Sequence, residues 1–218
     1  MKRLIVSLLM LTILCAVGTT VFAADDQDKA KDDGFISLFD GKSLEGWKVG
    51  ENADSFKVED GMIVANGPCA HLFYDGKVND HNFKNFHFKA DVKTMPNSNA
   101  GLYIHTKYQE SSWPSIGYEI QVNLTHGDPK KTGGLYGIRD ISADEINKIT
   151  KDGEWYTQEI IVQGKRIISI VNGKKLVDYV EPDDVEGGRK LSTGTFAIQA
   201  HDPGSKVYLK NIKVKPLD

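Results

Sequence analysis

The sequence predicts an all-β domain, built either as a sandwich of two sheets or as a barrel. Over most of the chain, short runs rich in β-branched and aromatic residues alternate with turn signals. Asp-Gly at 60–61 and Asn-Gly at 172–173 are among these signals, and such pairs favour tight hairpin turns. One segment, 142–149, has a helical pattern, with Ser142 and Glu145 at the spacing of a capping box.

The N-terminal residues 1–23 have the pattern of a secretory signal peptide. Two basic residues precede an apolar run that ends in small residues. The run is shorter than the roughly 20 residues that span a bilayer, so no membrane span is expected. A lipoprotein signal at Cys15 is disfavoured because a bulky leucine precedes it. The sequence therefore predicts a secreted protein, periplasmic or extracellular, with a charged flexible tether at 24–33.

The ordered domain is expected to fill residues 34–218 and to depend on its hydrophobic core. Of the two cysteines only Cys69 lies beyond the signal peptide, so no internal disulfide is expected. The whole chain has 27 basic and 30 acidic residues. Removal of the signal peptide takes away two basic residues, so 25 remain against 30 acidic ones and the formal charge becomes −5. A nucleic-acid partner is disfavoured because it needs a clustered basic face. No catalytic metal is predicted, because His71, His81 and His87 lack ligand spacing; a structural calcium on the sandwich edge stays open.

Two strand-like runs, 102–106 and 117–123, carry polar side chains on one face. Successive side chains of a strand point to opposite faces, so residues two apart share a face. The polar residues placed together in this way are Tyr103 and His105 on the first run, and Glu119, Gln121 and Asn123 on the second. If the runs pair in one sheet, they form a polar patch suited to sugar binding or to acid–base chemistry, with apolar residues facing a core.

Further strands are expected after the patch. They are a hairpin of 156–162 with 166–171, then 175–179, 194–201 and 206–214. On the run 194–201, Gln199 and His201 are two residues apart and share a face.

Seven segments match the pattern of one protein family in order and spacing. They are LFDGKSLEGW at 38–47, NAGLYIHT at 99–106, GYEIQVN at 117–123, KTGGLYG at 131–137, VNGKKLVDY at 171–179, GTFAIQAHD at 194–202 and VYLKNIKVKPLD at 207–218. Together they resemble the 3-keto-disaccharide hydrolase family, long known as the domain of unknown function DUF1080. The resemblance covers 34–218 and implies a concanavalin A-like jelly-roll sandwich of two antiparallel sheets. Many members carry Arg where this chain has His105, and Asp at Leu124 or Asn123, so the chain resembles a His-bearing subgroup.

The resemblance also implies a reaction on glycosides that carry a ketone at C3 of the sugar. The ketone acidifies the hydrogen on C2; a base removes it, the group at C1 is expelled, and water adds to the enone. Such a site needs a base of near-neutral pKa, donors aimed at the ketone oxygen and an acid for the leaving group. No cofactor is expected, but a separate sugar 3-dehydrogenase must make the ketone.

Three residues are predicted to be catalytic. Glu119 is the candidate general base, although a structural carboxylate would fit the same position. His105 is the candidate acid or electrophilic donor because imidazole titrates near neutral pH, although strand histidines are often simply packed. His201 either completes the site or holds the turn that follows it. The predicted substrate-binding residues are Tyr103, Trp113, Gln121, Asn123, His126, Lys131, Tyr136 and Gln199.

Two other functions remain open on the sequence. One is a non-catalytic carbohydrate-binding module, since this fold also hosts lectins. The other is a direct glycoside hydrolase, which would need two carboxylates flanking the bond. The run 117–123 offers Glu119 and no second acid, which disfavours direct hydrolysis.

Overall fold

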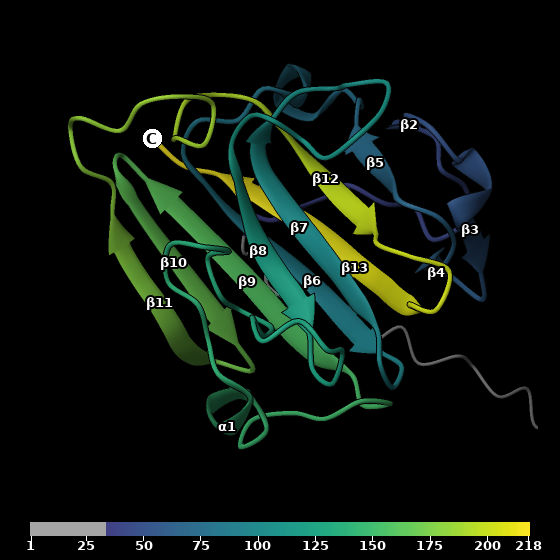
Figure 1. Ribbon diagram of the computed structural model, residues 1–218. Coiled ribbons are helices and arrows are strands. Elements are labelled where there is room, and N and C mark those ends of the chain that lie inside the picture. Colours follow the sequence, from purple (N-terminus) through teal and green to yellow (C-terminus); the bar gives the residue numbers. More distant parts are fainter. Residues whose placement is uncertain (1–33) are drawn as a thin grey trace, which may run out of the picture. The chain divides into compact units, whose positions relative to one another are not determined.

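Two antiparallel sheets pack face to face in residues 34–218, the part of the chain that this computed structural model describes (Figure 1). The five-stranded sheet has the order β2 (Trp47–Val49), β5 (Ala70–Tyr74), β12 (Thr195–Ala200), β7 (Asn99–Thr106) and β8 (Tyr118–Asn123). The eight-stranded sheet has the order β11 (Lys174–Val180), β10 (Arg166–Val171), β9 (Tyr156–Gln163), β6 (Phe86–Thr94), β13 (Val207–Pro216), β4 (Met62–Ala65) and β3 (Phe56–Glu59), with β1 (Ile36–Ser37) beside β13. The predicted all-β jelly-roll sandwich is confirmed. The predicted signal peptide and tether lie outside the described residues.

The core lies between the two sheets and follows from alternation along the strands. On β6, every second residue is buried, starting at Phe86. Phe196 of β12 packs on Phe86 and Phe88, with ring centroids 4.9 Å apart in each pair, and so joins the sheets. Because aromatic side chains bury large areas, these contacts fix how the two faces meet.

The turns predicted from the sequence form in the eight-stranded sheet. The predicted hairpins form as β9, β10 and β11, and Asn172 and Gly173 both have positive φ, 47° and 76°, as a tight hairpin turn requires. The predicted helix forms as α1 (Ala143–Ile146), and the capping box of Ser142 and Glu145 is present. The 3₁₀ turns η1 (Ala53–Ser55) and η2 (Val78–His81) were not predicted. No helix in residues 34–218 is both apolar enough and long enough to cross a membrane.

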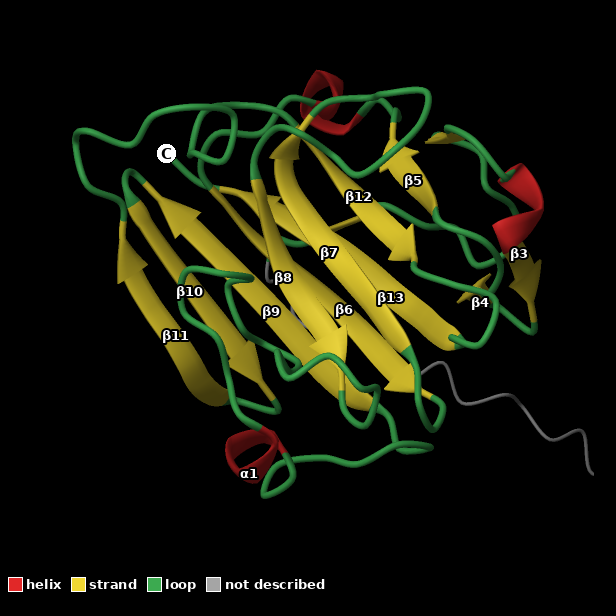
Figure 2. Ribbon diagram, in the orientation of Figure 1, coloured by secondary structure: helices red, strands yellow, loops and turns green. Residues whose placement is uncertain are grey.

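Four strands of the five-stranded sheet are buried on both of their faces. Every residue of β5, β7, β8 and β12 is buried, although only one face meets the other sheet. Long loops (green in Figure 2) join these strands, and the segment 132–136 hydrogen-bonds to β8 through Thr132, Gly133 and Tyr136. The outer face therefore lies under loops, and it is the place for a site.

A bulge in β7 changes which residues face outward. Thr106 pairs with Thr195 and Tyr103 with Ala197, so β7 carries one residue more than β12 between these pairs. The extra residue is accommodated at His105, whose φ is +53°, and its ring packs in the core against Phe86, 5.6 Å between centroids. The expectation that His105 shares a face with Tyr103 is therefore wrong, because the bulge interrupts the alternation.

Candidate active site

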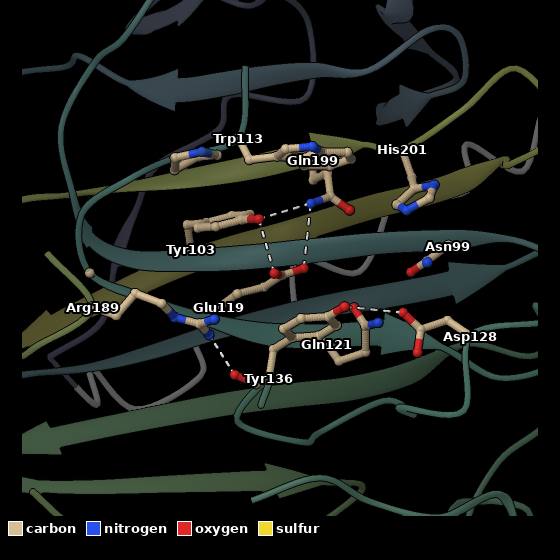
Figure 3. Close-up of a pocket in the computed structure, with 12 residues that line it drawn as sticks. Asn99, Tyr103, Trp113, Glu119, Gln121, Asp128, Tyr136, Arg189, Gln199 and His201 are labelled. Atoms are coloured by element: carbon tan, nitrogen blue, oxygen red, sulfur yellow. Dashed lines mark hydrogen bonds between the residues drawn. The ribbon is translucent and has the colours of Figure 1, made fainter. Parts of the chain in front are cut away.

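A polar pocket of about 270 Å³ lies on the outer face of the five-stranded sheet. Its floor comes from alternate residues of β7, β8 and β12, and its walls come from the loops around them (Figure 3). Seven residues predicted from the sequence line it: Tyr103, Trp113, Glu119, Gln121, Tyr136, Gln199 and His201. This volume lies just below the range of roughly 300–1,000 Å³ that is usual for ligand sites, which suits a small ligand.

Glu119 is the buried carboxylate at the centre of this pocket. It faces Tyr103 across the β7–β8 pair, and the tyrosine hydroxyl donates to Oε2 at 2.9 Å. Gln199 Nε2 donates to the Tyr103 hydroxyl at 3.0 Å and reaches Glu119 Oε1 at 3.4 Å. Burial raises the pKa of Glu119 to about 7, against the pull of these hydrogen bonds and of Arg189. A carboxyl group with such a pKa can both take up and release a proton near neutral pH.

The hydroxyl of Tyr103 is a fixed donor to Glu119. Burial, followed by the nearby charge of Glu119, raises the pKa of Tyr103 far above its ordinary value. The phenol therefore stays protonated, and it holds the Glu119 side chain in one orientation.

His201 is held by the residue that follows it. His201 Nδ1 lies 2.8 Å from Asp202 Oδ2, which also accepts from the Ser205 hydroxyl. Although burial acts to raise it, hydrogen bonds from Ser205, His201 and the Gly204 backbone hold the pKa of Asp202 below its usual range. Because an ionised carboxylate only accepts, Nδ1 carries the proton, and Nε2 of the neutral ring has the free lone pair.

Arg189 is a pocket residue that sequence reasoning missed. It lies in the charged, glycine-rich loop between β11 and β12, where an arginine looks like an ordinary solvated residue. The neighbouring Gly188 lets this loop approach the segment that precedes β8. Its carbonyl accepts from Gly117 N at 2.9 Å, and a Cβ on it would lie only 2.2 Å from the Ser115 carbonyl oxygen. The guanidinium donates to the Tyr136 carbonyl and adds a positive charge to the pocket.

Asp128 is a second carboxylate in the pocket, so the expectation of a lone acid is wrong. It lies on the loop after β8 and accepts from the Tyr136 hydroxyl at 3.3 Å. Its negative charge contributes to raising the pKa of Glu119. Asn99, at the start of β7, also lines the pocket and was not predicted. No local pattern marked either residue, since loop and strand-end positions join a site only through the fold.

Four predicted site residues lie elsewhere. Asn123 donates to the carbonyls of Asp128 and Lys130, at 3.0 and 2.9 Å. Lys131 Nζ donates to the carbonyls of His126 and Asp128, at 2.6 and 2.7 Å. These two side chains hold the loop after β8, and neither lines the pocket. His126 lies just outside it, and its ring is tilted against that of His201, 5.4 Å between centroids.

The fourth is His105, whose two ring nitrogens are both occupied by backbone groups. Nε2 lies 2.9 Å from the Lys84 carbonyl, and Nδ1 accepts from Ser192 N at 3.2 Å. Burial lowers the pKa of His105, which keeps the ring neutral. The residue therefore holds two loops to β7 and does not reach the pocket.

One cluster of side chains in residues 34–218 has the composition of a metal site. The ligand atoms of His126, His201 and Asp202 lie within 4.8 Å of one another. Hydrogen bonds already involve these side chains: Asp202 accepts from His201, and His126 Nδ1 accepts from Asp128 N at 3.1 Å.

A jelly-roll sandwich with a polar, aromatic-walled pocket on one outer face is an architecture that many carbohydrate-active proteins share. Residues 34–215 match the 3-keto-alpha-glucoside-1,2-lyase-like domain, and the chain belongs to this family. A curated relative from Bacteroides thetaiotaomicron, named 3-keto-disaccharide hydrolase, is 25% identical over 235 residues, covering 85% of this chain and 79% of the relative.

This chain is also similar to solved structures of carbohydrate-active proteins. A protein from Parabacteroides distasonis, provisionally named a glycosyl hydrolase, is 27% identical, with a TM-score of 0.70 over 85% of this chain and 95% of that one. The carbohydrate binding module CBM66 from Bacillus subtilis has a TM-score of 0.51 at 10% identity, over 78% of this chain and 95% of the module. The second likeness concerns the fold alone.

Proposed function

We propose that this protein is a secreted enzyme that cleaves the glycosidic bond of a 3-keto-glycoside by elimination and hydration. One observation carries the proposal: a buried carboxylate, Glu119, whose pKa lies near 7, stands in a small polar pocket of a chain that belongs to this family. A base with such a pKa suits removal of a proton that an adjacent ketone has acidified.

Glu119 takes the proton from C2 of the sugar, and the electron pair moves onto the C3 oxygen as an enolate. Arg189 is the cation of the pocket and stabilises this negative charge. Collapse of the enolate breaks the bond between C1 and the leaving oxygen, and leaves a double bond between C1 and C2 conjugated to the ketone. Water then adds its oxygen to C1 and a proton to C2, which completes net hydrolysis.

His201 serves the leaving group and the water. Its Nδ1 is engaged by Asp202, so Nε2 is the nitrogen available for proton exchange. Protonated His201 gives a proton to the leaving oxygen, and the neutral ring then takes one from the attacking water. Glu119 returns its proton to C2 in the same step, so both groups end as they began.

The remaining pocket residues bind the sugar ring. Trp113 offers an aromatic face, 46% exposed, to the apolar side of a sugar. Gln121 and Asn99 offer amide groups that both donate and accept toward hydroxyls. The ketone itself is proposed to come from a separate sugar 3-dehydrogenase.

The test compares purified protein on 3-keto-glucosides of both anomers and on the unoxidised parent glucosides. Release of the aglycone from the keto sugar alone, with deuterium exchange at C2 followed by NMR, would support elimination. Release from the parent glucoside would instead favour direct hydrolysis, for which Asp128 supplies the second acid that the run 117–123 lacked. Binding without release would leave a carbohydrate-binding module.

A further inference from the structure

A second cavity, of about 390 Å³, lies at the end of the same outer face, where β5 and β7 end and β12 begins. It is lined by Lys48, Phe73, Asp80, Thr106, Tyr108 and Thr195, among others. It shares no residue with the pocket around Glu119, and nothing in the proposed reaction uses it.

A buried cluster with two aromatic rings lies between the two cavities. Phe73, which lines the second cavity, and Tyr103, which lines the first, belong to one buried cluster on the outer face with Ala197. The ring of His71 contacts Tyr103 and Trp113, at 5.3 and 5.6 Å between centroids, and lies 6.2 Å from Phe73.

The spacing along β12 sets the reach that a ligand would need. Gln199 lies in the first cavity and Thr195 in the second, four residues apart and so about 13 Å at roughly 3.3 Å per residue. A single sugar ring is shorter than this span. A ligand in both cavities must therefore be an oligosaccharide of several units.

One loop supplies an aromatic ring to each cavity. The loop 107–117 places Trp113 at the first cavity and Tyr108 at the second. Gln109 fixes this loop, because its Nε2 donates to the carbonyls of Ser111 and Trp113, at 2.7 and 2.8 Å, while its Oε1 accepts from Ser115 N at 3.0 Å. These hydrogen bonds tie the backbone on either side of Trp113 to the residue that follows Tyr108.

A buried hydroxyl at the second cavity has no partner. Thr106 is 1% exposed, and its Oγ1 makes no hydrogen bond. The bulge at His105 shifts the alternation by one residue, so that Thr106 falls on the outer face, where it lines the cavity. Buried hydroxyls are nearly always paired, so a free one at a cavity wall suits a ligand that brings its own hydroxyl.

The rim of the second cavity is strained. Asn79, Asp80 and His81 have φ of 51°, 47° and 45°, a left-handed run without glycine. Such conformations are costly and collect at ligand sites. They are held here by Asn79 Nδ2, which donates to the Asn82 carbonyl at 2.7 Å, and they place Asp80 and His81 on the cavity wall.

The chemistry of this wall is that of a sugar site. Tyr108 is 41% exposed, packs edge-on against Phe73 at 5.5 Å, and carries Lys48 Nζ 3.7 Å from its centroid. Aromatic rings beside carboxylate, amide and ammonium groups match the apolar faces and hydroxyls of a sugar. We propose that the second cavity is a carbohydrate subsite that holds a distal unit of an oligosaccharide whose reacting unit lies beside Glu119. The proposal rests on the proposed function and extends it to longer substrates.

The test is a ladder of substrate lengths. The 3-keto derivatives of maltose and maltotetraose are compared for kcat/KM, with the cello-oligosaccharides as a second ladder. In whichever series the enzyme turns over, wild type is expected to have the higher kcat/KM for the longer substrate, through a lower KM. Tyr108→Ala should reduce this ratio of kcat/KM values by up to about tenfold. Tyr208→Ala, which removes an aromatic ring from β13 in the eight-stranded sheet, is the matched control and should leave the preference as in wild type.

Turnover that is equal for both lengths, or a preference that survives Tyr108→Ala, would overturn the subsite and leave the proposed function standing. If no keto sugar turns over, the proposed function fails, and calorimetry with the unoxidised oligosaccharides decides the subsite. The subsite is supported if wild type binds the tetrasaccharide more tightly than the disaccharide and Tyr108→Ala loses this difference. It is rejected if wild type binds both lengths equally.

Discussion

Gly101 makes the room in which Glu119 stands. A Cβ on Gly101 would lie 2.3 Å from Oε1 of Glu119 and 2.9 Å from its Cδ. The glycine faces Gln121 in the β7–β8 pair, two positions along from the pair of Tyr103 with Glu119 and on the same face of the sheet. A strand glycine often marks a close approach of another group, and here that group is the carboxylate of the pocket.

Gly101→Ala is therefore expected to displace the carboxylate while the sheet is retained. The atoms it meets belong to a side chain that can rotate, so the loss should fall on turnover, at least about tenfold, more than on stability. Turnover of a 3-keto-glucoside and circular dichroism measure the two effects. Gly127→Ala is the matched control, because a Cβ there meets nothing within 4 Å. Equal activity in both variants would show that this gap has no role in placing Glu119.

Glu119→Gln should change how stability depends on pH. The pKa of Glu119 is about 7 in the folded protein and 4.5 in the reference state, so the unfolded chain loses this proton first as pH rises. Wild-type stability should then fall between about pH 4.5 and 7, by about 3 kcal/mol in all. Glutamine cannot ionise, so the variant should lack this fall and be the more stable protein at pH 8. Urea unfolding at pH 4 and 8 measures it, and parallel curves for the two proteins would count against the raised pKa.

Asp202→Asn should impair His201 without removing it. An amide can present either its oxygen or its NH₂ group to Nδ1, so the ring is no longer held with its proton on that nitrogen. We expect turnover to drop by about 10²-fold, the scale of one general acid–base contribution. Nitrogen NMR of the ring reports the tautomer directly. In the double variant with His201→Ala the two losses should not add, whereas full additivity would mean that Asp202 acts through another residue.

His105→Ala separates a structural role from a catalytic one. The imidazole bonds to the Lys84 carbonyl and the Ser192 amide, so its removal leaves two buried groups unpaired. The free energy of unfolding should fall by about 2–5 kcal/mol, through these bonds and the lost packing on Phe86. Denaturant unfolding measures this loss, and turnover is measured per folded molecule. A collapse of turnover with unchanged stability would restore the catalytic role that the sequence suggested for His105.

Much of the fold could be predicted from the chain because it depends on local chemistry. The hairpin turn at Asn172 and Gly173 and the capping box at Ser142 depend on neighbouring residues alone. Alternation also placed Glu119 with Gln121, and Gln199 with His201, since side chains of a regular strand repeat every two residues, and all four line the pocket.

Residue patterns predicted the all-β class, the family resemblance predicted the sandwich, and alternation along the strands identified Tyr103, Glu119, Gln121 and Gln199 as candidate pocket residues. The remaining features of the site follow from long-range packing. A one-residue bulge turned His105 into the core, and no residue pattern announces such a bulge. Arg189 and Asp128 reach the pocket on loops, whose paths depend on what they pack against rather than on any period in the chain. The physical reason is the range of the forces: turns and alternation follow from neighbours in sequence, whereas loop docking depends on contacts that exist only once the sheets have packed.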